Sequence, residues 1–327
     1  MRAHVAAIAS MKGGVGKTTL TLSLAEGTAA LKSKRVLVID LDPQINASTL
    51  LTGAVPKDSV PWRTGTSLQH FLEKRLSHPN TVADAYVLKD AMDFSPASTV
   101  SLMSGDYELR SFERRLLVKP KQTVDAALNF ARDTMQGLLD EQRSLFDLIL
   151  FDCPPGFSIF TEAALGLSDT VILPTAPNNL GTQGLSAFVK YMEDELEIGD
   201  ACERAHVFLT MTGRTKTSLE FEKAVRGEQN KLEPRYQVLK CGYPYMDGFQ
   251  KAMDRREWNM RKLGAIQRRL NQLRNRTLFD RLYDGVDEHV EKLVTEAWTV
   301  FKPEGGRDGR IPASQGPRGH HPHEARP

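Results

Sequence analysis

Short runs of apolar residues recur along the chain and are separated by longer stretches of mixed polarity. Many of their residues are β-branched, which is typical of strands that are buried on both faces. The runs occupy residues 4–9, 35–40, 100–103, 146–152, 170–175, 206–210 and 236–241. Because helical stretches alternate with the runs, the pattern predicts an α/β fold with a mostly parallel, twisted sheet and helices on both faces.

The stretches between the runs predict the helices that cover the sheet. Three of these helices are expected at residues 20–31, 67–76 and 123–141. A longer helical region over residues 249–275 carries apolar residues three and four apart, namely Leu263, Ile266, Leu270 and Leu273. A final helix carries a similar stripe between Val286 and Phe301. Residues 51–100 contain four prolines and little periodicity, so we expect loops there around the helix at 67–76.

The chain is expected to form one domain over residues 1–301, followed by a disordered tail over residues 302–327. The tail is rich in Gly, Pro, Arg and His, and its one large aliphatic residue is Ile311. Such a segment cannot bury enough apolar surface to offset the entropy cost of ordering. Three tail histidines are interpreted as an incidental cluster rather than a metal site: His320, His321 and His323.

The most informative motif lies between the first apolar run and the first helix. Residues 12–19 read Lys-Gly-Gly-Val-Gly-Lys-Thr-Thr, and a glycine loop between a strand and a helix is the context of a phosphate-binding loop. The backbone N–H groups of Gly13, Gly14, Val15 and Gly16 are expected to face a phosphate, helped by the positive end of the helix dipole. Lys17 would supply a charge for the β- and γ-phosphates and Thr18 a hydroxyl for Mg²⁺, and Thr19 completes the expected nucleotide-binding set.

This loop departs from the usual pattern, which has a glycine where Met11 stands, and it carries a second lysine, Lys12, at its head. That is the deviant Walker A signature, and the sequence resembles the ParA/MinD family of ATPases. It is most similar to ParA-type partition ATPases without an N-terminal DNA-binding domain. The resemblance implies a P-loop NTPase fold, ATP and Mg²⁺ as ligands, and an ATP-dependent homodimer in which Lys12 reaches the partner's nucleotide.

Acidic residues end two of the apolar runs. Asp40 and Asp42 lie in Asp-Leu-Asp-Pro-Gln-Ile-Asn-Ala-Ser, and Asp152 precedes Cys-Pro-Pro-Gly. Because the carboxyl ends of parallel strands converge on one crevice, we expect all three acids beside the loop. The first segment resembles the family's second motif, although the family usually has glycine at the position of Ile45, and the second resembles its Walker B equivalent.

The resemblance implies a role for each acid. Asp42 would position the attacking water, while Asp40 and Asp152, together with Thr18, would belong to the Mg²⁺ shell. The catalytic set implied in this way is Lys12, Lys17 and Asp42. Cys153 is interpreted as a small buried residue rather than a nucleophile.

Positive charge is concentrated near the C-terminus of the expected domain. Residues 251–281 contain ten basic and three acidic side chains, which is typical of a surface that binds a polyanion. ParA-type relatives bind DNA non-specifically through basic C-terminal surfaces, so the resemblance favours DNA over a merely solvated face. The expected DNA-binding residues are Arg255, Arg256, Arg261, Lys262, Arg268, Arg269, Arg274 and Arg276. No helix-turn-helix pattern precedes the loop, so we expect no sequence-specific operator binding.

We therefore expect an ATPase switch that dimerises with ATP, binds DNA non-specifically, and partitions or positions a plasmid, a chromosome or a protein cargo. An unidentified partner protein would stimulate its slow hydrolysis. The alternative is a MinD-like membrane-associated ATPase, but the final helix is acidic where a basic membrane-binding helix would be needed, so no membrane association is expected. A metabolic or redox enzyme on the same fold remains a third alternative.

The cysteine pattern and the lengths of the apolar runs predict the compartment. Three cysteines show no metal-ligand or disulfide spacing, and no run approaches the roughly 18 apolar residues of a membrane span. The strand pattern begins at residue 4, so we also expect no signal peptide. We expect a cytoplasmic, nucleoid-associated protein.

Overall fold

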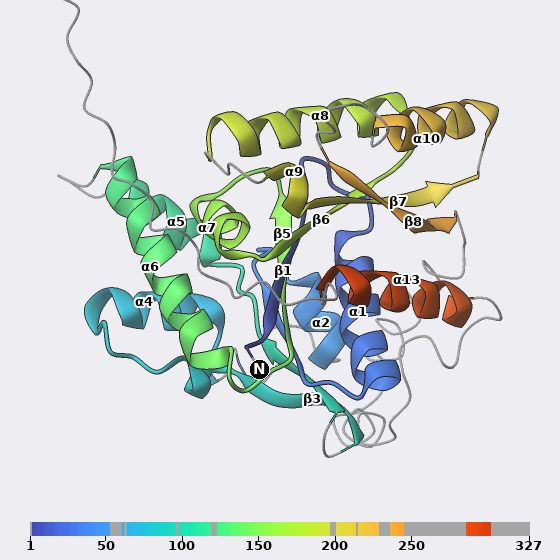
Figure 1. Ribbon diagram of the computed structural model, residues 1–327. Helices are drawn as coiled ribbons and strands as arrows, with labels where there is room; N and C mark the ends of the chain where they lie inside the picture. Colours follow the sequence, from blue (N-terminus) through green and yellow to red (C-terminus); the bar gives the residue numbers. More distant parts are fainter. Residues whose placement is uncertain are drawn as a thin grey trace, which may run out of the picture.

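The computed structural model describes residues 2–52, 61, 64–95, 98–118, 123–196, 201–213, 215–228, 236–244 and 286–301. Among these residues, eight strands form one sheet in the order β3-β4-β2-β5-β1-β6-β7-β8 (Figure 1). The strands are β1 (His4–Ser10), β2 (Val36–Asp40), β3 (Leu88–Ser95), β4 (Ser98–Met103), β5 (Leu148–Pro155), β6 (Thr170–Thr175), β7 (Ala205–Thr212) and β8 (Gln237–Pro244). All neighbouring pairs are parallel except β3 and β4, which pair antiparallel at one edge.

Helices cover both faces of this sheet (Figure 1). On one face lie α1 (Lys17–Lys32), α2 (Asn46–Thr52) and α13 (Val286–Phe301). The core of the other face contains residues from α4 (Leu68–Ser77), the 3₁₀ helix η2 (Ala83–Tyr86), α5 (Leu109–Leu117), α6 (Val124–Gln142), α7 (Ile159–Leu167), α8 (Asn179–Asp194) and α10 (Lys216–Glu228). A short helix, α9 (Ala201–Arg204), precedes β7.

The alternation of side chains along the strands produces two cores. In β1, Val5 and Ala7 are buried against the helices of the α6 and α7 face, whereas Ala6 and Ile8 are buried against α1 and its neighbours. Successive side chains of a strand point to opposite faces, so a strand buried on both sides is apolar at every position. This is why the apolar runs are continuous, and it confirms the predicted α/β class with helices on both faces.

The structure confirms each strand that the apolar runs predict, and it confirms the helices at 20–31, 67–76, 123–141 and at the end of the described chain. It adds α2, α5, α7, α8, α9, α10, η2 and the edge strand β3, none of which we predict from the sequence. β3 was missed because its sequence, Leu-Lys-Asp-Ala-Met-Asp-Phe-Ser, mixes charged and apolar residues, as suits an edge strand. The predicted helical region at 249–275 and the tail from 302 lie outside the described residues.

The last helix is tied to the strand at the far edge of the sheet. Glu296 of α13 accepts hydrogen bonds from the backbone N–H groups of Lys240 and Cys241 in β8. The same helix packs closely on α1, where a Cβ added to Gly27 would lie 2.5 Å from Cγ2 of Val294. In the part of the chain that the structure describes, no helix has the length and apolar character needed to cross a membrane.

Candidate phosphate-binding site

The glycine loop joins the end of β1 to the first residue of α1. Gly14 and Gly16 have positive φ angles of 75° and 87°, a left-handed conformation that glycine adopts without strain. Gly16 caps α1 with no side-chain hydrogen bond, and the first turn of the helix has no acidic residue. The first N–H groups of α1 therefore have no side-chain cap to compete with an anion.

Lys17 lies inside this loop rather than on the surface. Its side chain is buried, and Nζ donates a hydrogen bond of 3.0 Å to the carbonyl oxygen of Lys12. The hydroxyl of Ser10 donates to the same oxygen at 2.9 Å. Burial lowers the pKa of Lys17, and the nearby carboxylates of Asp152 and Asp42 partly oppose this shift. The structure thus holds a cation at the position where the phosphates of a nucleotide would need one.

Asp152 is the central acid of the site. It is fully buried, and its two carboxylate oxygens accept hydrogen bonds of 2.8 Å from the hydroxyls of Thr18 and Thr21. Burial raises the pKa of Asp152 to about 6. The structure therefore brings together the hydroxyl and the carboxylate that the sequence assigns to Mg²⁺. We did not predict Thr21, although its position one turn after Thr18 on the same helix face would have indicated it.

Asp40 lies next to Asp152 because β2 and β5 pair in register at these two residues. Its carboxylate accepts hydrogen bonds from the backbone N–H and the hydroxyl of Ser48, at 2.9 and 2.6 Å, and from the N–H of Asp42 at 3.1 Å. Burial and the neighbouring Asp152 raise the pKa of Asp40 to about 8. Asp40 thus holds the turn between β2 and α2, and its place in a metal shell stays a prediction.

Asp42 lies in that turn and contributes to its geometry. The side chain is mostly buried, and its carboxylate accepts a hydrogen bond of 2.9 Å from the N–H of Gln44. Its carbonyl oxygen accepts another, of 2.7 Å, from the N–H of Ile45. Ile45 has a φ of 53°, a left-handed conformation that is strained for a β-branched residue. Glycine would adopt this conformation without strain, which explains why the related motif has glycine there.

Gly105 closes the turn from the neighbouring strand. A Cβ added to Gly105 would lie 3.0 Å from Cγ of Asp40 and 3.1 Å from Cγ2 of Ile45. Its N–H donates a hydrogen bond of 2.9 Å to the hydroxyl of Ser48. The loop after β4 therefore packs directly on the acid-bearing turn, and a side chain at this position would push on Asp40 and Ile45. Neither Ser48 nor Gly105 is a site residue that we predict from the sequence.

Thr210 lies on the opposite side of the loop from the acids. It is buried near the carboxyl end of β7, and its hydroxyl has no hydrogen-bond partner among the described residues. A Cβ added to Gly16 would lie 3.8 Å from Cγ2 of Thr210. The next residue, Met211, has a left-handed φ of 57°. A buried hydroxyl that lacks a partner beside a ligand loop is a candidate ligand contact.

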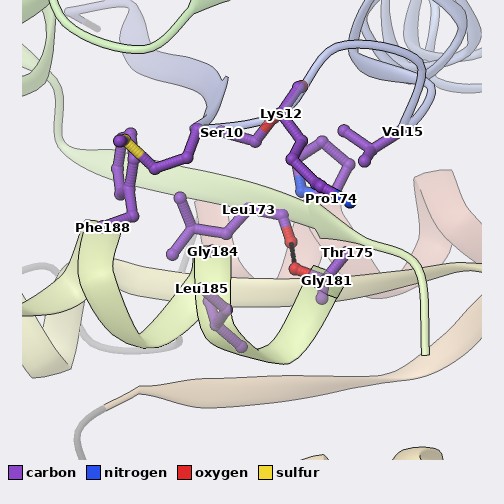
Figure 2. A pocket seen from close by; sticks show the side chains of 11 residues that line it. Ser10, Lys12, Val15, Leu173, Pro174, Thr175, Gly181, Gly184, Leu185 and Phe188 are labelled. Atoms are coloured by element: carbon purple, nitrogen blue, oxygen red, sulfur yellow. Dashed lines mark hydrogen bonds between the residues drawn. The ribbon is translucent and has the colours of Figure 1, made fainter. Parts of the chain in front are cut away.

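A small pocket lies between the head of the loop and α8 (Figure 2). Counting the space open to solvent, it encloses about 290 Å³. Figure 2 shows Lys12 and Val15 on the loop side, Leu173 at the end of β6, and Gly184 and Leu185 on α8. Lys12 therefore passes beside α8, and its action on a second subunit stays a prediction.

The site as a whole suits Mg²⁺ bound with a nucleotide. Among the described residues, no group of three His, Cys, Asp or Glu side chains is arranged to hold a metal. Mg²⁺ is usually held by one or two protein oxygens together with phosphate oxygens and water, which the Thr18 and Asp152 pair would satisfy. Cys153 is fully buried as expected, and burial raises the pKa of its thiol, which disfavours the nucleophilic thiolate. The expected DNA-binding residues of 251–281 lie outside the described residues.

Comparison with known proteins identifies the family of this chain. A family model described as an AAA domain matches residues 3–197. The chain is 35% identical over 191 residues to an uncharacterized protein of Pseudomonas putida, covering 57% of this chain and 61% of that protein. It is 29% identical over 187 residues to the chromosome partitioning protein ParA of Myxococcus xanthus, covering 56% of each. The match thus spans about three fifths of the length of the first of these relatives.

A solved structure extends the likeness over most of the fold. The ATP complex of a McdA variant from Cyanothece superposes with a TM-score of 0.62 at 17% identity, covering 90% of this chain and 97% of that one. At this identity the likeness concerns the fold alone. The strand arrangement and the loop are those of a P-loop NTPase, as the sequence predicts.

Proposed function

Because this chain belongs to the ParA/MinD family of ATPases, we propose that it hydrolyses ATP slowly and uses ATP to switch between single subunits and a DNA-binding homodimer. The observation that carries this proposal is the joint position of Lys17, Thr18 and Asp152 at one loop. A buried cation, a hydroxyl and a carboxylate at the start of a helix are the groups that bind a Mg²⁺-nucleotide.

Each residue has a distinct task in this proposal. Lys17 would leave the carbonyl of Lys12 and bind the terminal phosphates, and the N–H groups of residues 13–19 would bind the remaining phosphate oxygens. Thr18 would ligate Mg²⁺ directly, while Asp152 would hold its water shell. Bound Mg²⁺ would neutralise the charge that develops on the phosphates. Asp42 would orient the attacking water from the turn that Asp40 and Ser48 hold.

In this proposal, Lys12 serves the dimer and the basic segment at 251–281 serves DNA binding. The side chain of Lys12, at the head of the loop, would reach the nucleotide of a second subunit. The basic segment at 251–281 would bind the DNA backbone without sequence preference. A partner protein that stimulates hydrolysis would return the subunits to the free state and so position a plasmid, chromosome or protein cargo on the nucleoid. ATP occupancy would set the population of DNA-binding dimers.

The test is co-sedimentation of the protein with DNA in the presence of ATP, ADP or no nucleotide. We expect DNA binding with ATP only, and no binding by Lys17→Ala, because the loop then lacks its phosphate cation. Asp42→Ala should bind DNA with ATP for longer than wild type, because the nucleotide persists. Log affinity should fall with log salt concentration by roughly 0.9 per phosphate contact.

Two outcomes would contradict the proposal. One is DNA binding that is independent of nucleotide and unchanged in Lys17→Ala. The other is wild-type turnover in Asp42→Ala, which would remove Asp42 from the reaction. Anionic vesicles tested in parallel distinguish this proposal from the MinD-like alternative. That alternative requires binding to vesicles with ATP and no binding to DNA.

A further inference from the structure

Thr21 places a hydroxyl in the apolar interior between α1 and the sheet. Its side chain is fully buried, and its neighbours along the helix, Leu20, Leu22 and Leu24, belong to the core of that face. Threonine favours a helix less than alanine or leucine does, because its branched side chain loses rotamer freedom there. An apolar residue of similar shape would serve packing alone, so the hydroxyl of Thr21 calls for a separate explanation.

The hydroxyl of Thr21 has two acceptors within reach. It lies 2.8 Å from Oδ1 of Asp152 and 3.1 Å from the carbonyl oxygen of Lys17, one turn earlier in the helix. A hydroxyl has a single proton to donate, and hydrogen bonds to a carboxylate are shorter and stronger than those to a neutral carbonyl. The bond to Asp152 is therefore the main contact of this hydroxyl.

The two carboxylate oxygens of Asp152 have separate hydroxyl donors, and both donors come from α1. Oδ2 accepts from Thr18 and Oδ1 accepts from Thr21, each at 2.8 Å. The terminal torsion of an aspartate side chain has broad minima, so a carboxylate that is held at one oxygen can still turn. A carboxylate that is held at both oxygens cannot. Thr21 therefore fixes the plane of this carboxylate, which Thr18 alone would not do.

Other carboxyl groups surround Asp152 and oppose its ionised form. Asp40 on β2 pairs in register with Asp152 on β5, and both side chains are fully buried. Burial and the charge of Asp42 raise the pKa of Asp152, whereas the hydrogen bonds from Thr21 and Thr18 lower it. The two bonds from α1 therefore favour the carboxylate and hold it beside Thr18.

We propose that Thr21 is a positioning residue for Mg²⁺: by holding Oδ1 of Asp152, it keeps Oδ2 directed at Thr18, the residue proposed to ligate the metal. This role rests on the proposed ATPase function. A hydroxyl oxygen has two lone pairs, so Thr18 can donate its proton to Oδ2 and still offer a lone pair to a cation. Residues behind metal ligands orient them in this way, and their loss typically weakens metal affinity by about tenfold to a hundredfold.

A purely structural role of Thr21 leads to a different expectation. Loss of the hydroxyl would then loosen α1 and weaken nucleotide binding equally with and without metal. A positioning role affects binding of the metal only, because Lys17 and the backbone N–H groups of the loop can bind phosphates without Asp152. The comparison of the two conditions therefore separates the two roles.

The test measures the affinity of Mn²⁺ for the protein saturated with a non-hydrolysable ATP analogue. Mn²⁺ prefers the same oxygen ligands as Mg²⁺ and is detected by electron paramagnetic resonance. Thr21→Val should weaken Mn²⁺ binding by about tenfold or more and leave the affinity for the analogue in EDTA unchanged. Thr21→Ala, which also lacks the hydroxyl and favours a helix, should show the same loss. Thr21→Ser keeps the hydroxyl and should bind Mn²⁺ as wild type does.

Thr28→Val is the matched control, because it makes the same substitution in the same helix. Thr28 is similarly buried, and its hydroxyl has no hydrogen-bond partner among the described residues. The Thr28→Val protein should bind Mn²⁺ and the analogue with wild-type affinity.

Four results would overturn the positioning role of Thr21. These are wild-type Mn²⁺ affinity in both variants that lack the hydroxyl, an equal loss of analogue affinity in EDTA, an equal loss of Mn²⁺ affinity in Thr28→Val, and a Thr21→Ser protein as weak as Thr21→Val. A wild-type protein that binds neither the analogue nor Mn²⁺ would overturn the proposed function, and this role with it. The wild-type titration alone shows that result, so the two failures are distinguishable.

Discussion

Two strained residues and one hydroxyl without a partner among the described residues lie beside the glycine loop. Ile45 and Met211 both have left-handed backbones, and they lie on opposite sides of the glycine loop, one beside the acids and one beside Thr210. Such conformations cost on the order of 1–3 kcal/mol each and persist only where surrounding packing holds them. For Ile45 that packing comes from Gly105, whose lack of a side chain leaves room for the isoleucine.

Thr210 provides the sharpest prediction for a single residue. We expect Thr210→Val to weaken ATP binding about fivefold to tenfold, because one hydrogen bond to the ligand is worth roughly 1 kcal/mol. Without ATP the variant should be slightly more stable than wild type, since a buried hydroxyl without a partner is removed. Calorimetric titration and thermal unfolding measure the two effects.

The control for this prediction is Thr28→Val. Thr28 lies in α1, is equally buried, and also has a hydroxyl with no partner among the described residues, but it is three turns from the loop. The Thr28→Val protein should be stabilised in the same way as Thr210→Val and should bind ATP normally. Equal ATP affinity of both variants and wild type would show that Thr210 does not touch the nucleotide.

Among the elements, the pair formed by α1 and α13 connects the glycine loop with the C-terminal part of the chain. The two helices approach closely at Gly27, where Val290 and Val294 of α13 fill the space that a side chain would occupy. Valine side chains are stiff and cannot turn away easily. α13 is therefore anchored to the helix that begins at Lys17.

Gly27→Ala should destabilise the protein by roughly 1–3 kcal/mol, because the new Cβ would lie 2.5 Å from Val294 and 2.9 Å from Val290. The same change at Gly166 in α7 meets no atom within 4 Å. There alanine should be neutral or stabilise by about 0.5–1 kcal/mol, since alanine favours helix more than glycine. Urea unfolding of both variants measures the difference, and similar stabilities would contradict the close packing of α1 on α13.

At the scale of the whole molecule, the order of the strands places the acids of the site on one side of β1 and Thr210 on the other. β5 and β2, which carry Asp152 and Asp40, lie on one side of β1, and β6 and β7 lie on the other. Metal and terminal phosphates are therefore expected on the β5 side, and the nucleoside on the side of β7. Side chains from residues far apart in sequence meet at the loop only because the strands are arranged in this order.

The paired acids also predict how global stability depends on pH. Asp40 has a folded-state pKa of about 8 against an ordinary value of 3.8, so the folded protein binds about one more proton than the unfolded chain between these values. Its contribution to stability is therefore complete below pH 4 and is lost as the pH rises toward 8. Asp152, with a pKa of about 6, acts in the same direction.

The measurement is urea unfolding between pH 5 and 7 without Mg²⁺ or nucleotide. In Asp40→Asn the slope of unfolding free energy against pH should be less negative than in wild type by about 1.4 kcal/mol per pH unit. Identical slopes would show that Asp40 is ionised in the folded state throughout this range.

The sequence alone was sufficient for the sheet, most of its strands and the loop from Lys12 to Thr19. Strands buried on both faces must be apolar at every position, and a phosphate loop must place glycines and a lysine in fixed order, so both leave local signals. β3 and α5 left weaker signals, because their exposed faces carry charges like those of a loop.

Only the tertiary structure decided which groups meet. It paired Thr21 with Asp152 and Ser48 with Asp40, placed Gly105 against Ile45, left the hydroxyl of Thr210 unpaired beside Gly16, and set Glu113 at the start of α7. These contacts join separate strands and helices, and their partners are selected by strand order and packing distance. A chain read one residue at a time carries the chemistry of each group but not the distances between them.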